Sequence, residues 1–393
     1  MADRRDHALD GLRGLAALAV LCFHTWLYRT NRAPGAPRGL LNQAFFEANI
    51  GLICFFVLSG FLLYRPFARA ALHGERAVDA RGYALRRAAR IVPAYYAVMI
   101  GAVLLYALAG YHASTVSAAR LPLFAVFGQN YSMHTVMHID PVTWTLCIEA
   151  AFYVALPLIG WLVWRLGPQR AGWQVGVLVG LVAITVVWNT IAFNHRWDER
   201  ATKSLPAWLG EFAVGMLVAH WLAARERRGA SRARLGARTT ALIALAGAAV
   251  VFAGCHWAQS RWLQADVRRA VALYLVLAVG FALLIAALAA GRGPVVRALA
   301  WRPLALLGLI SYGVYLWHLP LILALKQVHA LPTPLGPRLA IVFALACLCG
   351  ALSWRLVERP AIAWAARRAR RSADRRAPAA LRGVRAAAAQ ATR

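Results

Sequence analysis

Ten apolar segments, each close to the roughly 20 residues that cross a bilayer, constrain the fold of this 393-residue chain more than any other feature. Backbone polar groups in lipid must be satisfied within the spanning segment, so such segments form α-helices. The sequence therefore predicts an all-α integral membrane protein, a bundle of about ten transmembrane helices. The segments lie at about residues 12–28, 49–64, 91–110, 142–164, 175–193, 205–223, 239–255, 271–290, 304–325 and 335–356.

The distribution of charge agrees with this segmentation and predicts an orientation. The chain carries 44 Lys and Arg residues against 15 Asp and Glu, a net charge of +29. With the N-terminus in the cytoplasm, 32 of the 44 basic residues fall on the inner side and 12 on the outer side, as the positive-inside rule expects. Membrane topology thus accounts for the basic charge better than nucleic acid binding does. We predict that the protein spans a bacterial inner membrane and that both termini lie on its cytoplasmic side.

The domain organisation follows from where the apolar segments stop. Residues 1–360 are expected to form one transmembrane domain, and the Arg/Ala-rich residues 361–393 a disordered cytoplasmic tail that contacts anionic lipid or only solvent. The first apolar segment is interrupted by His24, so we interpret it as a retained helix rather than a signal peptide. The six cysteines show no zinc-ligand spacing, and no metal is expected.

Arg13 and His24 are the polar exceptions in the first segment, and they are eleven positions apart. At roughly 100° per residue they share one helix face, separated by about 16 Å along the axis. An arginine near a helix end can extend to the interface, whereas a histidine inside the span is costly to bury. Such a histidine either serves function or hydrogen-bonds a neighbouring helix.

The fourth segment carries Thr145, Glu149 and Tyr153 at i, i+4 and i+8, which places them on one helix face. A carboxylate inside a span needs a partner, and the sequence favours His24 because both residues are expected at comparable depth. A Glu–His pair of this kind is typical of a general base. It is equally typical of a proton relay.

Two further groups have open alternatives. Arg87 and Arg90, at i and i+3, project from one side of a helix, where they either clamp a phosphate or supply ordinary topology-setting charge. Ser311, Tyr315 and His318 form a polar stripe at i, i+4 and i+7 that either lines a substrate site or packs the bundle. In the second segment, Ser59-Gly60 is interpreted as a small-residue packing surface.

In their order and spacing, these motifs resemble the integral-membrane acyltransferase family 3, the bacterial O-acyltransferase type. The resemblance extends from about residue 9 to residue 360. It is carried by Arg13 with His24, Arg87 with Arg90, and the runs Phe55-Phe-Val-Leu-Ser-Gly-Phe-Leu-Leu63, Trp144-Thr-Leu-Cys-Ile-Glu149, Ser311-Tyr-Gly-Val-Tyr-Leu-Trp-His318 and Val357-Glu-Arg-Pro360.

The resemblance implies transfer of an acyl group, often acetyl, from cytoplasmic acyl-CoA to a hydroxyl of a cell-surface or exported glycan. It implies that His24 is catalytic, with Glu149 expected to orient it. The residues expected to bind the donor are Arg13, Arg87 and Arg90. The residues expected to line the substrate site are Trp144, Ser311, Tyr315 and His318.

A second function class uses the same residues. A proton-coupled transporter or flippase would employ His24 and Glu149 as a proton relay. The chain shows no convincing internal repeat, which weakens a transporter built from inverted halves. For the acyltransferase, we expect a polar cavity lined by the first, third, fourth and ninth segments.

Overall fold

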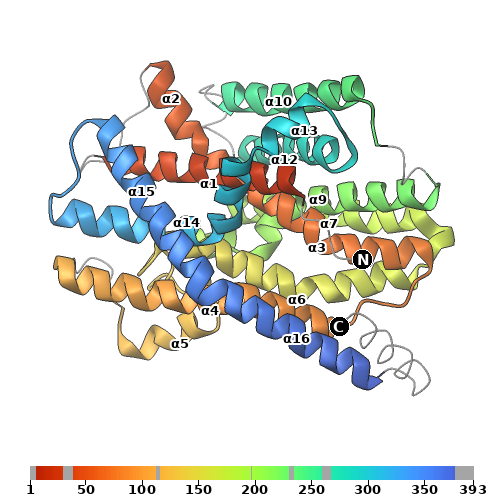
Figure 1. Ribbon diagram of the computed structural model, residues 1–393, viewed down its shortest axis with the longest axis horizontal. Coiled ribbons are helices and arrows are strands. Elements are labelled where there is room, and N and C mark those ends of the chain that lie inside the picture. Colours follow the sequence, from red (N-terminus) through yellow and green to blue (C-terminus); the bar gives the residue numbers. More distant parts are fainter. Residues whose placement is uncertain are drawn as a thin grey trace, which may run out of the picture.

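The computed structural model describes residues 6–29, 39–111, 116–195, 197–229, 234–258 and 267–376, which form helices and no strands (Figure 1). Ten helical segments within these ranges are long and apolar enough to cross a membrane, which confirms the predicted bundle. The helices are α1 (His7–Leu27), α2 (Leu40–Glu47), α3 (Gly51–His73), α4 (Ala80–Ala109), α5 (Leu121–Ala125), α6 (Trp144–Arg165), α7 (Ala171–Asn194), α8 (Glu199–Thr202), α9 (Leu205–Arg227), α10 (Ala237–Ala258), α12 (Val267–Ala290), α13 (Pro294–Leu299), α14 (Arg302–Gln327), α15 (Leu335–Ser353) and α16 (Arg359–Arg376).

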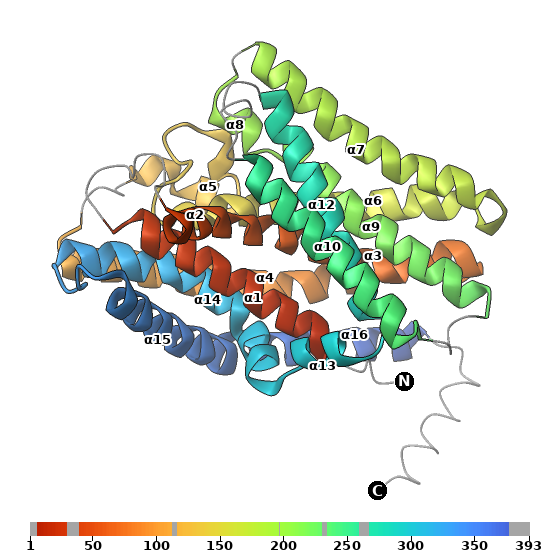
Figure 2. The ribbon, with the colours of Figure 1, turned by 90° about the horizontal axis from the view of Figure 1, so that it is seen from above.

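The helices that surround the centre of the bundle come from distant parts of the chain. α1 packs against α14 and α3, and α3 packs in turn against α9 and α6. Seen from above in Figure 2, α7 and α15 lie towards opposite edges of the bundle. Residues from α1, α3, α6 and α14 are therefore brought together around one interior region.

Glycines allow α3 and α9 to approach closely, as expected for Gly60. A Cβ atom at Gly60 would lie 2.0 Å from the Phe212 carbonyl oxygen, and one at Gly215 would lie 2.0 Å from the Val57 carbonyl oxygen. Small residues are the usual means by which membrane helices approach at backbone distance. The neighbouring Ser59 has a different role from the packing we expected, because its hydroxyl faces the site described below.

α4 begins at Ala80 and not near Ile91, so Arg87 and Arg90 lie on the helix itself. Asp79 explains this early start, because its side chain accepts a hydrogen bond from the Gly82 N–H at 3.1 Å and caps the helix. Hydropathy predicts the start of the apolar span, which comes after the charged residues. The helix itself starts earlier, where its first backbone N–H groups find a hydrogen-bond acceptor.

The first part of the C-terminal tail is ordered, which corrects the expectation for residues 361–393. α15 continues through a π-helical turn (Trp354–Glu358) into α16, which runs from Arg359 to Arg376. α16 packs against α4. Residues 377–393 lie outside the described residues. The Ala and Arg residues of α16 favour a helix, and contact with α4 holds this helix against the bundle.

Asp140 precedes α6 and is held in a buried position. Its carbonyl oxygen accepts hydrogen bonds from the N–H and the hydroxyl of Thr143, at 3.1 and 2.6 Å. Its two carboxyl oxygens are buried, and no described residue hydrogen-bonds to them. Burial raises the pKa of Asp140 well above its usual range, because desolvation disfavours the charged form. The folded protein therefore holds this carboxyl protonated above the pH at which an unfolded chain would ionise it.

We expect Asp140→Asn to leave the protein at least as stable as the parent at neutral pH. A raised pKa in the folded state makes the parent lose stability as pH rises from about 4, by about 1.4 kcal/mol per pH unit up to the folded pKa. The asparagine amide does not ionise, so the stability of the variant relative to the parent should increase over this pH range. At acidic pH this difference in stability should disappear. Melting curves in detergent between pH 4 and pH 8 measure it. A variant less stable than the parent at every pH would contradict a neutral Asp140.

Candidate active site

Two cavities lie along α1. Arg13 lines one of them and His24 lines the other, and the helix rise between these two residues is about 16 Å. We call them the arginine cavity and the histidine cavity. The arginine cavity measures about 160 Å³ and the histidine cavity about 520 Å³. The shared helix face predicted for Arg13 and His24 thus places them on two successive cavities.

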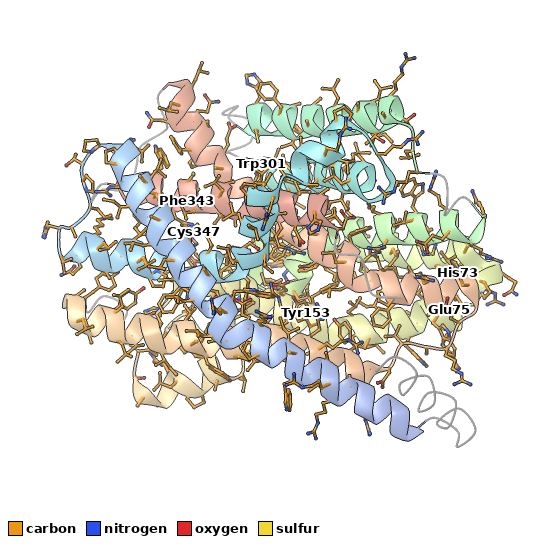
Figure 3. All side chains as sticks on the ribbon, in the orientation of Figure 1. His73, Glu75, Tyr153, Trp301, Phe343 and Cys347 are labelled. Carbon is orange, nitrogen blue, oxygen red and sulfur yellow. The ribbon has the colours of Figure 1, made fainter. Side chains whose placement is uncertain are left out.

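The arginine cavity is formed by α1, α3, α4, α6 and α14, which are the four predicted segments together with α3. Its polar lining residues are Arg13, Ser59, Arg87, Arg90, Thr145, Glu149, Tyr153, Ser311, Tyr312 and Tyr315. Tyr153, which lines this cavity, is labelled near the centre of the view in Figure 3. Ser311 lines this cavity as predicted, and its hydroxyl donates to the Gly308 carbonyl at 2.8 Å.

Glu149 is held on the arginine cavity by two hydroxyl groups. Its Oε1 atom accepts hydrogen bonds from the Ser59 hydroxyl at 2.7 Å and from the Tyr153 hydroxyl at 2.5 Å. Among the described residues no hydrogen bond joins it to His24, so the expected Glu–His pair is wrong. Thr145, one turn earlier on α6, already lines both cavities. Glu149 lies one turn beyond it, about 6 Å along the axis, on the arginine side.

The three predicted donor-binding arginines differ in their partners. Arg13 Nη1 lies 2.9 Å from Asp10 Oδ1. Arg90 Nη1 lies 2.6 Å from Glu358 Oε2, and the Glu358 side chain is 0% exposed. Arg87 forms no ion pair with a described residue, and its Nε atom is buried without a hydrogen-bond partner. Arg87 is therefore the arginine of the three whose charge is left for a ligand.

Glu358 is the residue that the sequence reasoning did not assign. It sits in the π-helical turn after α15 and accepts a second hydrogen bond from the Ser353 hydroxyl at 3.2 Å. The Arg90 guanidinium is also sandwiched by aromatic rings, with centroids of Tyr312 and Trp354 each 5.5 Å away. The available signal was a carboxylate at the end of a span, although the flanking Arg355 and Arg359 offered it nearer partners.

His24 is paired with His318, and the two rings are hydrogen-bonded in a defined order. His318 Nδ1 lies 3.2 Å from the Val314 carbonyl oxygen, and His24 Nδ1 lies 3.1 Å from the Val20 carbonyl oxygen. A carbonyl oxygen only accepts, so both Nδ1 atoms carry the proton when the rings are neutral. His318 Nε2, 3.0 Å from His24 Nδ1, then accepts from it.

This order fixes which nitrogen of His24 is basic. With the proton on Nδ1, the Nε2 atom of His24 carries a free lone pair. His24 is part-exposed and lines the histidine cavity, whereas His318 is 0% exposed and lines neither cavity. His318 therefore supports His24 from behind, and its expected substrate-lining position is wrong. Hydropathy indicates how deep each histidine lies in its span, but it does not indicate which helix faces meet.

The histidine cavity combines aromatic rings with a few polar groups. The rings of Trp208 and Tyr274 are stacked with centroids 5.4 Å apart, and those of Trp144 and Trp208 lie 5.5 Å apart. Trp144 lines this cavity, as predicted for a substrate-lining residue. Beside His24, its other polar or aromatic lining residues are Phe23, Tyr28, Asn49, Thr145, Asn189, Thr202, Lys203, Glu211 and Tyr315.

A thin wall separates the two cavities. Leu52, Thr145 and Tyr315 line both of them. The Thr145 and Tyr315 hydroxyls are 2.8 Å apart, and each also lies within hydrogen-bonding distance of the Val142 carbonyl oxygen. Tyr315 thus takes the lining position predicted for it, as a part of the wall.

The chain matches known proteins over nearly all its length. A sequence model of the acyltransferase domain family matches residues 6–355. The peptidoglycan O-acetyltransferase OatA of Listeria monocytogenes is 25% identical over 372 residues, which are 90% of this chain and 55% of the relative. The putative peptidoglycan O-acetyltransferase YrhL of Bacillus subtilis is 25% identical, over 90% of this chain and 54% of the relative.

A third relative is matched over more of its own length. The putative membrane-bound transacylase BcsY of Komagataeibacter xylinus is 28% identical over 91% of this chain and 82% of the relative. The chain spans about half the length of the first two relatives. No solved structure matches it. Since the family model covers the ten spans and both cavities, the chain belongs to the acyltransferase domain family.

Proposed function

We propose that the protein is a membrane O-acyltransferase that moves an acyl group, in the simplest case acetyl, from cytoplasmic acyl-CoA to a hydroxyl of a cell-surface or exported glycan. The observation that carries the proposal is His24, whose free Nε2 belongs to a ring on the histidine cavity next to the wall shared with the arginine cavity. The names of the relatives, peptidoglycan O-acetyltransferase and membrane-bound transacylase, support the same reaction class.

The donor enters at the arginine cavity in this proposal. The positive-inside rule places the start of α1 in the cytoplasm, which is the side where acyl-CoA is available. Arg87 forms no ion pair with a described residue and its Nε atom has no hydrogen-bond partner among them, so its guanidinium is the one that we assign to a donor phosphate, which it can bind in bidentate fashion. The cavity of about 160 Å³ takes the narrow acyl-pantetheine end of the donor, while the nucleotide stays at its mouth. The thioester is then directed at the wall of Thr145 and Tyr315.

The acceptor enters the histidine cavity from the other end of the bundle. His24 Nε2 removes the proton of the acceptor hydroxyl while its oxygen attacks the thioester carbonyl carbon. The carbon–sulfur bond breaks, and the CoA thiolate leaves and takes the proton back from the His24 imidazolium. His318 keeps the Nδ1 proton of His24 in place throughout, because its Nε2 remains the acceptor.

Acceptor-dependent thiol release tests this function. Purified protein in detergent receives acetyl-CoA and a panel of glycan acceptors, and free CoA is measured with a thiol reagent alongside the base-labile ester on the glycan. An acyltransferase releases one thiol for each ester formed. If no acceptor elicits thiol release and proteoliposomes instead accumulate the glycan with a proton, the protein is a transporter and the proposal is wrong.

His318→Phe should lower kcat by about tenfold while the KM for donor and acceptor stays within about twofold, because it removes one hydrogen bond that orients the base. His318→Gln should recover much of the loss, since its side-chain oxygen can accept from His24 Nδ1. The pH profile of kcat/KM should shift in the phenylalanine variant. An unchanged profile with only a lower yield of folded protein would reduce His318 to a packing residue.

A further inference from the structure

Glu211 is a buried carboxylate of the histidine cavity that the mechanism does not use. It lies on α9, within a membrane-spanning segment, and is 1% exposed. Its Oε2 atom is buried, and no described residue hydrogen-bonds to it. A polar group in such a position costs free energy unless a partner satisfies it. The cavity that Glu211 lines is where such a partner would arrive.

The aromatic residues that line the same cavity as Glu211 indicate what kind of ligand could be that partner. Trp144, Trp208 and Tyr274 line the same cavity, with Trp208 stacked on Tyr274 and next to Trp144. Such rings offer broad apolar faces, and a carboxylate offers acceptors for hydroxyl hydrogens. A pyranose ring has both kinds of surface, apolar C–H faces and an edge of hydroxyl groups. A cavity of about 520 Å³ is of the size that encloses a small ligand.

The charge at the rim argues against a cationic occupant. Lys203 lines the cavity, and its ammonium lies 5.9 Å from the centre of the Trp144 ring. Glu199, its ion-pair partner, does not line this cavity. A cationic ligand would face this ammonium group on the aromatic surface that it needs for cation–π contact. A neutral hydroxyl-rich ring meets no such repulsion.

We infer that the histidine cavity is a sugar-binding site in which Glu211 accepts a hydrogen bond from a ring hydroxyl of the acceptor while Trp144 and Trp208 pack against the sugar face. Glu211 is then a specificity-determining residue. It holds one hydroxyl of the sugar ring, so that another hydroxyl of the same ring reaches His24. The inference rests on the proposed function for the statement that this sugar is the acyl acceptor. The binding itself does not depend on acyl transfer.

Calorimetric titration of the 393-residue chain in detergent with a peptidoglycan-derived disaccharide and with a glucan disaccharide tests the inference, with no acyl-CoA present. We expect Glu211→Gln to weaken binding of the recognised disaccharide by about tenfold, because one of the two acceptor oxygens is replaced by an amide nitrogen that only donates. Glu226→Gln is the matched control. Glu226 lies on the same helix but does not line this cavity, and its Oε2 atom lies 3.5 Å from Arg69 Nε. This variant should bind the disaccharide as the parent does.

Trp208→Leu provides a second variant in case Glu211→Gln does not fold, and it should also weaken binding by tenfold or more. Binding unchanged in both variants, or displacement of the disaccharide by tetramethylammonium, would overturn the sugar site. Glu211-dependent binding without acyl transfer would keep the site and reject the proposed function. Acyl transfer to the disaccharide with binding independent of Glu211 and Trp208 would keep the function and reject the site.

Discussion

His24→Ala should lower acyl transfer by about 10²–10⁴-fold while acyl-CoA still binds, because a general base contributes a factor of this size. The arginines that we propose for donor binding lie on the other cavity, so calorimetric binding of a non-hydrolysable acyl-CoA analogue should change less than threefold. The measurement is specific activity per folded molecule, with folding checked by size-exclusion chromatography in detergent.

His220→Ala is the matched control for this experiment. His220 is also a buried histidine within a span, on α9, and it lines neither cavity. We expect it to lower thermal stability at most and to keep the specific activity. If His24→Ala behaves in the same way as His220→Ala, then His24 is a packing residue and the base lies elsewhere.

Arg87→Ala should mainly weaken donor binding, whereas Arg90→Ala should mainly lower the stability of the protein. Arg87 has no ion-pair partner among the described residues, so its loss should raise the donor KM by about tenfold to a hundredfold with little change in stability, the effect of about 1.5–3 kcal/mol. Arg90 is bonded to the buried Glu358, so its loss should destabilise the protein by about 3–5 kcal/mol, because it leaves an uncompensated buried charge. Donor titrations and melting curves separate the two effects.

A double variant sharpens the comparison. Arg90→Met combined with Glu358→Gln removes both charges, and it should regain much of the stability lost in Arg90→Met alone. Arg87→Ala should gain nothing from Glu358→Gln, because the two residues are not paired. A large stability loss in Arg87→Ala with an unchanged donor KM would show that Arg87 is structural and that the donor phosphates bind elsewhere.

The fold was largely predictable because hydropathy and charge act on whole segments. Ten apolar stretches separated by basic loops leave little choice but ten helices, and the structure has them. The start of α4 was missed because it depends on one capping side chain, Asp79. The helical part of α16 was missed because the expectation of disorder rested on hydropathy, whereas Ala and Arg are strong helix formers and the helix packs against α4.

The polar residues that lie around the two cavities could be picked out of the sequence one by one, but their pairing could not. His24, Glu149 and His318 can be identified from the sequence because placing an ionisable group inside a membrane span costs free energy in any fold. The pairing of His24 with His318 depends on how α1 and α14 are rotated against each other. No periodicity within one helix contains that information, and a one-turn difference in depth was enough to move Glu149 to the other cavity.

The wall of Leu52, Thr145 and Tyr315 has a consequence for the membrane as a barrier. The Thr145 and Tyr315 hydroxyls are in contact in this wall, between the two cavities. In the proposed reaction, donor and acceptor approach the wall from its two faces and meet only where the thioester carbon is attacked. Only the acyl group then changes sides, so neither the bulky donor nor the glycan has to cross, and the enzyme needs no passage wide enough for either.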